Sequence, residues 1–457
     1  MKNTWSYKLR VLILPGLKRW ILFIAIGIIT IVLGVLLLLE EHPVRTMINL
    51  VNDILQDATR VLPSKISGLI ALSIGLIVTT VAVGKLALSI LRAYLPQDRE
   101  SIPDVLYRRW HLDRGPRVVV IGGGTGLSNL LKGLKGFTNN ITAIVTVGDD
   151  GGSSGRLRQE LGVLPPGDIR NCITALADEE KLVTELFRYR FQQGSGLEGH
   201  SFGNLFLSAV CAITNGDMLE AAKVASRVLN SCGQVLPSTL QGMELVAELE
   251  NGTIIRGESN IPEADSRIKS LRAEPTNPEP TPEALEAIEE ADFLILGPGS
   301  LYTSIIPNLM VKGIPEAIAR SKARKVYVCN LMYQKGETVG YTVADHVKAI
   351  LTHAGYPNGS QLNLPLRLID RVLVNLIPGE DLTALPQGMV RFDPGELKAL
   401  GVRPMLRELG SKTLPGHHDP EKLAAALMLW YVRRNRSKGL FKRTPKPQKP
   451  NSVAASL

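Results

Sequence analysis

Two glycine-rich stretches of this sequence contain the residues best suited to hold a phosphate group. The first, GGGTG at residues 122–126, follows an apolar β-branched run at 117–121 and precedes leucines at helical spacing. Glycines let the backbone approach a phosphate closely, and the N–H groups that open the next helix attract the anion. Leu127 stands where the dinucleotide fingerprint G-x-G-x-x-G has its last glycine. The stretch therefore predicts a nucleotide or phosphate ligand, with a merely tight turn as the alternative.

The second stretch, GPGSLYTS at 297–304, follows another short apolar run at 293–296. Two glycine loops at the carboxyl ends of strands in one sheet form a cleft at the topological switch point of that sheet. We therefore expect one loop to hold each end of a diphosphate-bearing ligand.

An acidic stretch, GDDGGSSGR at 148–156, lies at the end of the strand predicted over 141–147. A solvated turn does not need two carboxylates, two hydroxyls and four glycines together. Asp149 and Asp150 are placed to accept hydrogen bonds from a ribose or to hold a divalent metal, and the glycines and serines offer donors to a diphosphate.

Polar residues also stand at the ends of three other predicted elements. We expect Asp168 to cap a helix that begins after the loop 164–167, and His200 and Asn204 to lie at the start of an apolar helix. Asn330 follows the strand predicted over 325–329. For Asp168, and for His200 and Asn204, a ligand contact and a purely structural helix cap are both open interpretations.

The elements that must position these groups alternate between strands and helices, which is typical of a Rossmann-like, doubly wound and mostly parallel α/β sheet. Further elements are a strand at 371–375 and helices at 283–290, 342–352 and 420–432. Residues 240–249 and 254–256 read as a hairpin around Asn251-Gly252. Residues 257–284 are polar and proline-spaced and predict a long excursion or flap instead of a packed element.

Charge and cysteine usage exclude several classes of protein. The net charge is +9, but residues 1–19 and 433–457 alone contain thirteen Lys and Arg and no acid, so the rest of the chain is net negative. The protein therefore lacks a general positive field that could hold nucleic acid. The four cysteines form no C-x-x-C pair and no zinc spacing, which fits a reduced, cytoplasmic body.

Two uncharged apolar runs, at 20–39 and 66–84, are long enough to cross a bilayer. We expect a transmembrane helical hairpin over 20–94 in the cell inner membrane, because a signal peptide has a shorter apolar region. Lys and Arg flank both outer ends, which places the basic N-terminus (1–19) and the bulk of the protein in the cytoplasm. The connection at 44–62 reads either as an amphipathic surface helix or as a spacer. A linker at 95–116 leads to the α/β domain at 117–432, and the basic tail at 433–457 is expected to be disordered near the anionic leaflet.

Six motifs in order make the chain resemble the gluconeogenesis factor family, bacterial relatives of 2-phospho-L-lactate transferase, whose own reaction joins a phospholactate to a deazaflavin. The motifs are GGGTG (122–126), GDDGGSSGRLR (148–158), PPGDIRNC (165–172), HSFGNL (200–205), GPGSLYTSIIPNL (297–309) and NLMYQKGET (330–338). The resemblance covers roughly 115–430, and the hairpin and the basic tail imply a membrane-attached variant of the family's minimal form.

The resemblance implies a regulator that binds a nucleotide sugar such as UDP-N-acetylglucosamine and is needed for cell shape and wall synthesis on gluconeogenic carbon. Its implied partners are cell-wall synthesis or regulatory proteins, and a homo-oligomer is expected. No catalytic residue is assigned, because no nucleophile paired with a general base is visible in the sequence. The alternative is a metal-dependent transferase related to 2-phospho-L-lactate transferase, with Asp149 and Asp150 as ligands of Mg²⁺. A nucleotide-gated channel is a third class, but no selectivity filter stands between the two apolar runs.

The candidate ligand-binding residues are those that the motifs place at the carboxyl ends of strands or the starts of helices. They are Gly122, Gly123, Gly124, Thr125, Gly126, Asp149, Asp150, Gly152, Ser153, Ser154, Arg156, Asp168, Asn171, His200, Asn204, Gly297, Gly299, Ser300, Thr303 and Asn330.

Overall fold

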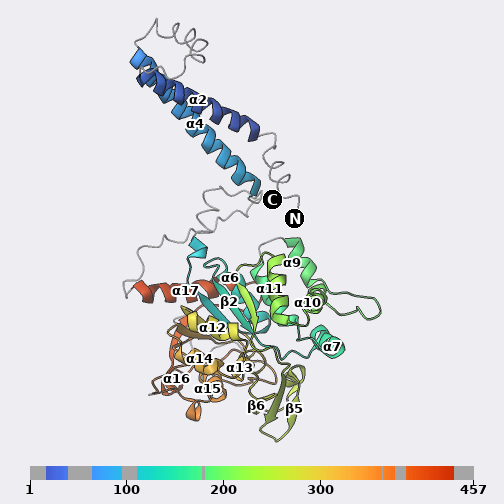
Figure 1. The fold of residues 1–457 in the computed structure, drawn as a ribbon. Helices are drawn as coiled ribbons and strands as arrows, with labels where there is room; N and C mark the ends of the chain where they lie inside the picture. The colour runs from blue at the N-terminus through green and yellow to red at the C-terminus, as the bar shows by residue number, and fades with distance from the viewer. Residues whose placement is uncertain are drawn as a thin grey trace. The chain divides into compact units, whose positions relative to one another are not determined.

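The computed structural model describes residues 17–39, 64–94, 111–177, 181–362, 364–375 and 388–436 (Figure 1). The chain divides into two compact units, Met1–Arg109 and Trp110–Leu457. The expected amphipathic connection at 44–62 lies outside the described residues, as do residues 95–110 of the linker and the tail from residue 437 onward. Residues 433–436, which were expected to be part of the disordered tail, belong instead to the last helix of the chain, α17 (Pro420–Arg436).

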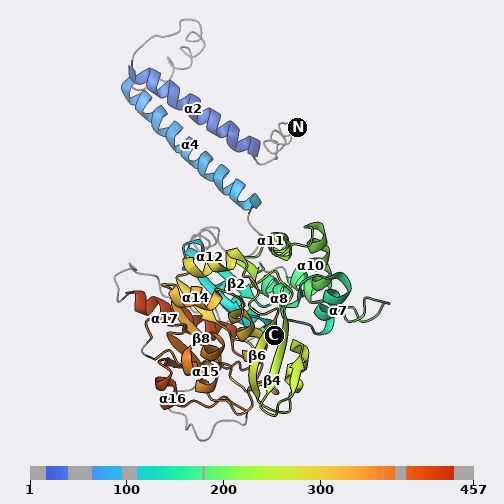
Figure 2. The ribbon, with the colours of Figure 1, turned by 60° about the horizontal axis from the view of Figure 1, so that its bottom comes forward.

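The first unit contains two helices that pack side by side along their length, α2 (Leu17–Leu39) and α4 (Ser64–Tyr94) (Figures 1 and 2). Glycines allow this approach: a Cβ atom at Gly34 would lie 2.7 Å from the backbone nitrogen of Leu72, and one at Gly75 would lie 2.8 Å from Cγ1 of Ile31. Small residues at such a contact are typical of helix pairs in lipid. Among the described residues, one helix contains a stretch long and apolar enough to cross a membrane, Gly68–Leu86 in α4. In α2 the corresponding apolar stretch, Leu22–Val32, is shorter.

A larger side chain at Gly34 is therefore expected to separate α2 from α4. We expect Gly34→Leu to lower energy transfer between dyes attached at the first residue of α2 and the last residue of α4, in the full chain in detergent. Gly84→Leu is the matched control, because no atom lies within 4 Å of a Cβ at Gly84. Equal energy transfer in both variants would contradict close packing through the glycines.

The second unit is built on a seven-stranded sheet in the order β10-β9-β8-β7-β1-β2-β3, with every neighbouring pair parallel. The strands are β1 (Val118–Gly122), β2 (Ile141–Val145), β3 (Gln234–Pro237), β7 (Phe293–Leu296), β8 (Arg324–Val328), β9 (Arg371–Asn375) and β10 (Arg403–Arg407). The predicted mostly parallel α/β fold is confirmed.

Helices cover both faces of the sheet. They are α6 (Gly124–Leu134), α7 (Gly152–Leu161), α8 (Gly167–Leu176), α9 (Lys181–Arg188), α10 (Phe202–Ile213), α11 (Met218–Val228), α12 (Pro282–Glu290), α13 (Ile306–Leu309), α14 (Ile314–Arg320), α15 (Val343–His353), α16 (Pro394–Ala399) and α17 (Pro420–Arg436). Val118 and Val120 of β1 belong to one hydrophobic cluster, whereas Val119 and Ile121 belong to the other. A strand buried on both faces in this way is apolar throughout, which explains the short apolar runs of the sequence.

A second, antiparallel sheet in the order β5-β4-β6 corrects the prediction for 257–284. Its strands are β4 (Glu244–Leu249), β5 (Ile254–Arg256) and β6 (Ile268–Glu274), and a 3-10 helix, η1 (Glu258–Glu263), lies between the last two. The expectation of an unpacked excursion was wrong, because β6 buries Ile268, Leu271 and Ala273. The charged residues between them face outward and hide the apolar pattern.

Candidate functional site

The glycine loops that follow β1 and β7 touch one another at the topological switch point. From β1 the chain adds β2 and β3 on one side, and from β7 it adds β8, β9 and β10 on the other. A Cβ atom at Gly126 would lie 2.8 Å from the carbonyl oxygen of Pro298 and 3.1 Å from Cα of Gly299. A Cβ at Gly299 would lie 3.2 Å from the carbonyl oxygen of Gly123. Glycine is needed in both loops for their backbones to approach this closely.

Asp168 lies at the same junction, but its role differs from the predicted one. The residue at the N-cap of α8 is Pro166, and Asp168 belongs to the first helical turn. Its Oδ2 instead accepts the backbone N–H of Gly124 at 2.7 Å, across 44 residues of chain. Desolvation by burial, together with the charge of Asp149, raises the pKa of Asp168 to about 6. Asp168 therefore does not cap α8 as predicted. Its carboxyl group instead holds the start of α6 through the N–H of Gly124.

The two carboxylates of the acidic stretch accept hydrogen bonds from different backbone groups. Oδ1 of Asp149 accepts the N–H of Gly151 at 3.0 Å, and Oδ1 of Asp150 accepts the N–H of Ser259 at 2.8 Å. Within the described part of the chain, no three His, Cys, Asp or Glu side chains are grouped so that they could hold a metal ion. The assignment of Asp149 and Asp150 as ligands of Mg²⁺ stays a prediction, because magnesium is commonly held by one or two carboxylates together with the phosphates of a bound ligand.

A cavity of about 450 Å³ opens where the two sheets meet above the ends of β2, β7 and β8. Three predicted residues, Asp149, Ser300 and Thr303, are part of its lining. The other lining residues are Glu258, Ser259, Pro262, Gln334, Lys335 and Glu337. The cavity lining thus contains both a hydroxyl-bearing glycine loop and several carboxylates.

Glu337 holds the second glycine loop in shape. The loop continues into a short π-helix, η2 (Leu301–Ile305), and Glu337 accepts the N–H of Tyr302 at 2.9 Å and the hydroxyl of Thr303 at 3.0 Å. Its side chain is buried, which raises its pKa. Single π turns of this kind occur frequently at functional sites.

Asn330 contacts the second glycine loop indirectly, through Gln334. Its amide donates to Oε1 of Gln334 at 3.0 Å, and Gln334 donates to the hydroxyl of Ser300 at 2.7 Å. Asn330 is thus connected to the cavity through Gln334 and is not itself part of its lining.

The first turns of α7 and α10 bring four more predicted residues together. The hydroxyl of Ser153 lies 2.9 Å from Nδ1 of His200, and Asn204 Nδ2 donates to Ser153 at 3.1 Å and to Ser154 at 3.5 Å. Burial and the charge of Arg156 lower the pKa of His200, which favours the neutral ring. Oδ1 of Asn204 is buried with no hydrogen-bond partner in the described structure. A hydroxyl beside an imidazole is thus present, although the sequence shows no such pair.

Seventeen of the twenty predicted residues, the GGGTG loop at 122–126 included, are not part of the cavity lining. Four of them shape the loops or contact other parts of the protein. Arg156 donates to the carbonyl oxygen of Glu198 at 2.6 Å, and Asn171 accepts a bond from Arg170 at 2.6 Å. Gly152 opens α7 with a positive φ of 50°, and Gly297 begins the second loop with a φ of 74°. These glycines shape the loops, and the two polar side chains bind other parts of the protein.

The cavity residues that the sequence did not predict come from two places. Gln334, Lys335 and Glu337 belong to the motif at 330–338, in which only Asn330 was selected. Glu258, Ser259 and Pro262 come from η1, which the second sheet carries over the cavity. Oε2 of Glu258 is buried without a hydrogen-bond partner among the described residues, and burial and the nearby carboxylates raise the pKa of Glu258 well above its usual value. No local sequence signal marks η1 as part of the site.

Ligand affinity is expected to depend on the protonation of Asp168. Because folding raises its pKa, its contribution to stability is present at low pH and is lost as the pH rises through about 6. The anionic ligand that the glycine loops predict would be favoured by the protonated form of this carboxyl, so its affinity should rise roughly tenfold between about pH 7.5 and about pH 5.5. Calorimetric titration with a UDP-sugar, the ligand class that the family resemblance implies, is suitable because both of its phosphates are esterified and do not titrate in this range.

The variant Asp168→Asn distinguishes the titration of Asp168 from that of other acidic groups near the site. The variant removes the carboxyl that lies near Asp149 and Arg170 but leaves Glu258, whose pKa is also raised. The pH dependence should flatten in the variant. An unchanged slope would assign the dependence to another group.

The chain is similar to known proteins over most of its length. The family model described as 2-phospho-L-lactate transferase CofD matches residues 118–409. A "Putative gluconeogenesis factor" of Nostoc sp. is 47% identical over 431 residues, which are 91% of each chain. The "Gluconeogenesis factor" of Bacillus subtilis is 48% identical over 319 residues, covering 68% of this chain and 97% of the relative. The crystal structure of a UPF0052 family member from Bacillus halodurans superposes with a TM-score of 0.63 at 47% identity and covers 69% of this chain and 99% of that one.

Proposed function

The chain belongs to the gluconeogenesis factor family, and from this premise we propose that it is a regulator that binds a nucleotide sugar resembling UDP-N-acetylglucosamine. In this role it supports cell shape and wall synthesis during growth on gluconeogenic carbon. The cell-wall synthesis or regulatory proteins that it acts on, and a homo-oligomeric state, are part of the same proposal.

The contact between the two glycine loops, beside a cavity of about 450 Å³, is the observation that carries this proposal. The loops offer backbone N–H groups and the hydroxyl of Ser300, which suit a diphosphate, whereas the hydroxyl of Thr303 already donates to Glu337. Asp149 is also part of the lining, where a carboxylate can accept hydrogen bonds from the hydroxyls of a sugar or ribose. The volume is within the range of sites for small ligands.

Isothermal titration of the full chain in detergent with UDP-N-acetylglucosamine, with and without Mg²⁺, tests this function. We expect heat with a micromolar constant and no product. The absence of heat at millimolar ligand would refute nucleotide-sugar binding. Binding of GDP in its place would favour the enzyme described below.

We also propose that α2 and α4 form a two-helix membrane hairpin in the cell inner membrane, with the α/β unit in the cytoplasm. The apolar stretch Gly68–Leu86 and the glycine contacts between the helices support this proposal. The similarity to the Nostoc relative covers 91% of this chain, which is more residues than the unit Trp110–Leu457 contains. It therefore includes part of the N-terminal unit. Carbonate extraction of membranes tests the attachment: the protein should remain in the pellet, and its release would refute a membrane span.

The second candidate is a transferase related to 2-phospho-L-lactate transferase, which the matching family model favours. In this alternative a nucleotide-activated phosphoacid is the donor and Mg²⁺ is required. Release of GDP or GMP from a phospholactate-type donor, in the presence of an acceptor and Mg²⁺, would support it. No release under these conditions would count against it.

The two aspartates are expected to differ in their effects on ligand binding. Asp149 is part of the cavity lining, so Asp149→Asn should weaken UDP-sugar binding by about tenfold, the scale of one charge-assisted hydrogen bond. Asp150 is not part of the lining and contacts it only through the N–H of Ser259, so Asp150→Asn should have a smaller effect. Calorimetry on both variants and on the double variant, with circular dichroism as the folding control, checks this order. A larger loss for Asp150→Asn would show that the position of η1 controls binding.

A further inference from the structure

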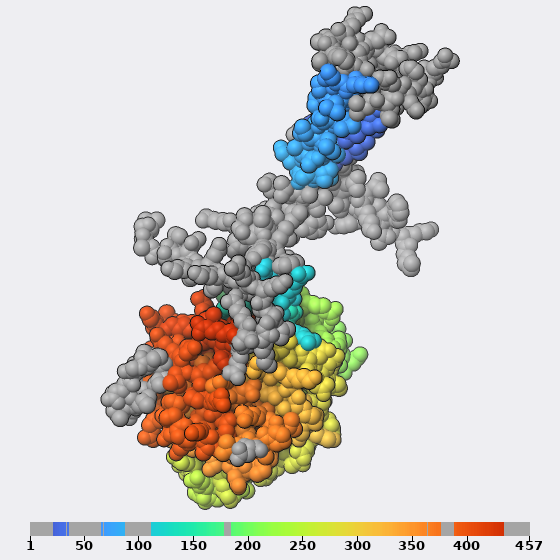
Figure 3. Space-filling view, turned by 90° about the vertical axis from the view of Figure 1, so that its left-hand side faces the viewer, coloured from blue at the N-terminus to red at the C-terminus, as the bar shows by residue number. Residues whose placement is uncertain are grey.

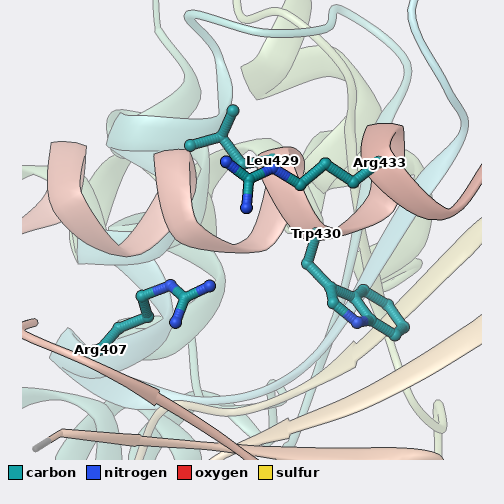
Figure 4. Close-up of a pocket in the computed structure, with 4 residues that line it drawn as sticks. All are labelled: Arg407, Leu429, Trp430 and Arg433. Atoms are coloured by element: carbon teal, nitrogen blue, oxygen red, sulfur yellow. The ribbon is translucent and has the colours of Figure 1, made fainter. Parts of the chain in front are cut away.

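A second cavity of about 350 Å³ lies away from the nucleotide-sugar site, at the end of the edge strand β10 and beside α17. Its lining consists of Arg407 from β10 and Leu429, Trp430 and Arg433 from α17 (Figure 4). We call these four residues the arginine pocket. Figure 3 shows the face of the α/β unit that the C-terminal elements form, in orange and red.

The two arginines of the pocket have guanidinium groups that can bind an anion, although one N–H of Arg407 already donates to the carbonyl oxygen of Leu406 at 2.6 Å. Among the described residues neither Arg407 nor Arg433 takes part in an ion pair, and both side chains are exposed. The acid next to Arg407, Glu408, is occupied by Lys422 at 2.6 Å. Figure 4 shows the guanidinium of Arg433 beside Leu429 on α17, and the guanidinium of Arg407 and the indole of Trp430 below the helix in this view. Guanidinium groups recognise phosphate with paired N–H donors.

The rest of the lining is apolar, which points to a ligand with both an anionic and an apolar part. Leu429 is 51% exposed and lies with Trp430 in the same lining as the two arginines. The ring of Trp430 lies 5.8 Å from that of Phe293 in β7, so the indole is held in place from the side of the core. Tryptophan and arginine together are typical of protein surfaces at the level of lipid headgroups.

We propose that the arginine pocket docks the headgroup of an anionic phospholipid at the membrane surface, with the phosphate between Arg407 and Arg433 and Leu429 and Trp430 at the acyl boundary. This inference rests on the proposed membrane attachment, which would keep the α/β unit near a bilayer. The sequence that follows the pocket is also basic: residues 433–457 contain eight Lys and Arg and no acid, which complements the negative charge of an anionic membrane surface. A free phosphate would satisfy the arginines but would leave the two apolar side chains exposed to water.

A fragment of residues 111–436 tests the pocket without the hairpin and without the tail. Such a fragment is expected to fold, because 99% of the chain of the Bacillus halodurans relative is matched by 69% of this one. The sequence contains four tryptophans, at 5, 20, 110 and 430, so Trp430 is the single tryptophan of the fragment. Its fluorescence therefore reports on the pocket alone.

Vesicles whose acyl chains carry bromine, a quencher of tryptophan fluorescence, are the probe. We expect quenching of Trp430 by brominated phosphatidylglycerol and little quenching by brominated phosphatidylcholine. The variant Arg407→Gln with Arg433→Gln should bind the anionic vesicles at least ~10-fold more weakly, in proportion to the two phosphate contacts that it loses. The variant Arg403→Gln with Arg227→Gln removes the same charge from exposed positions outside the pocket and should bind like the natural sequence.

Three results would overturn the proposal. These are no quenching by the anionic vesicles, an equal loss of binding in the two double variants, and full competition by millimolar glycerol phosphate, which would make the pocket a site for a soluble phosphate. None of these results bears on the titration with UDP-N-acetylglucosamine, so the pocket and the nucleotide-sugar site can fail separately.

Discussion

Replacing Gly126 by alanine is expected to weaken the binding of UDP-N-acetylglucosamine by about 100-fold, the effect of displacing a binding group by about 1 Å. The added methyl would lie 2.8 Å from the carbonyl oxygen of Pro298, which is backbone and cannot rotate away. The two glycine loops must then separate, and the N–H groups at the start of α6 move with the first loop. The expected loss corresponds to about 3 kcal/mol of binding free energy.

Gly136→Ala is the matched control for this variant. Gly136 lies shortly after the same helix, and the nearest atom to its Cβ position is the carbonyl oxygen of Gly133 at 3.4 Å, an ordinary contact. Calorimetric titration of both variants should show the loss only for Gly126→Ala, with circular dichroism spectra that are alike. Unchanged affinity of Gly126→Ala would mean that the ligand does not bind across the two loops.

Glu337→Ala is expected to lower the free energy of unfolding of the α/β unit by about 2–5 kcal/mol, since two buried donors lose their acceptor. These donors are the N–H of Tyr302 and the hydroxyl of Thr303, both in η2. Because η2 supplies Thr303 to the cavity, nucleotide-sugar binding should be lost as well. Urea unfolding of the fragment 111–436 measures the first effect, and calorimetry measures the second.

Glu337→Gln distinguishes the hydrogen bonds from the charge. Glutamine keeps one carbonyl oxygen that can accept the N–H of Tyr302, so about half of the lost stability should return. Glu263→Ala is the control, because Glu263 pairs with Lys335 at 2.8 Å while both side chains are 75% exposed, and such pairs contribute roughly 0–1 kcal/mol. Equal destabilisation by Glu337→Ala and Glu263→Ala would show that Glu337 does not organise the loop.

The central sheet could be predicted because its strands are buried on both faces. The runs at 117–121, 293–296 and 371–375 are apolar and bounded by glycine or polar residues, and each is a strand within one residue of the expected bounds. The second sheet could not be predicted in full. In β6, charged residues alternate with buried ones, and an isolated strand of this kind is not distinguishable from a solvated segment until β4 packs beside it.

The sequence by itself determined where the two glycine loops begin, because a close approach of backbones requires glycine whatever the rest of the chain does. It also determined that the acidic stretch stands at the end of a strand. Only the tertiary structure decided that Asp168 binds Gly124 instead of capping its own helix, that Ser153 meets His200, and that Glu258 lies over the cavity. These contacts join residues between 44 and about 110 positions apart, and such pairings depend on the order in which strands assemble into sheets, which no local pattern of residues encodes.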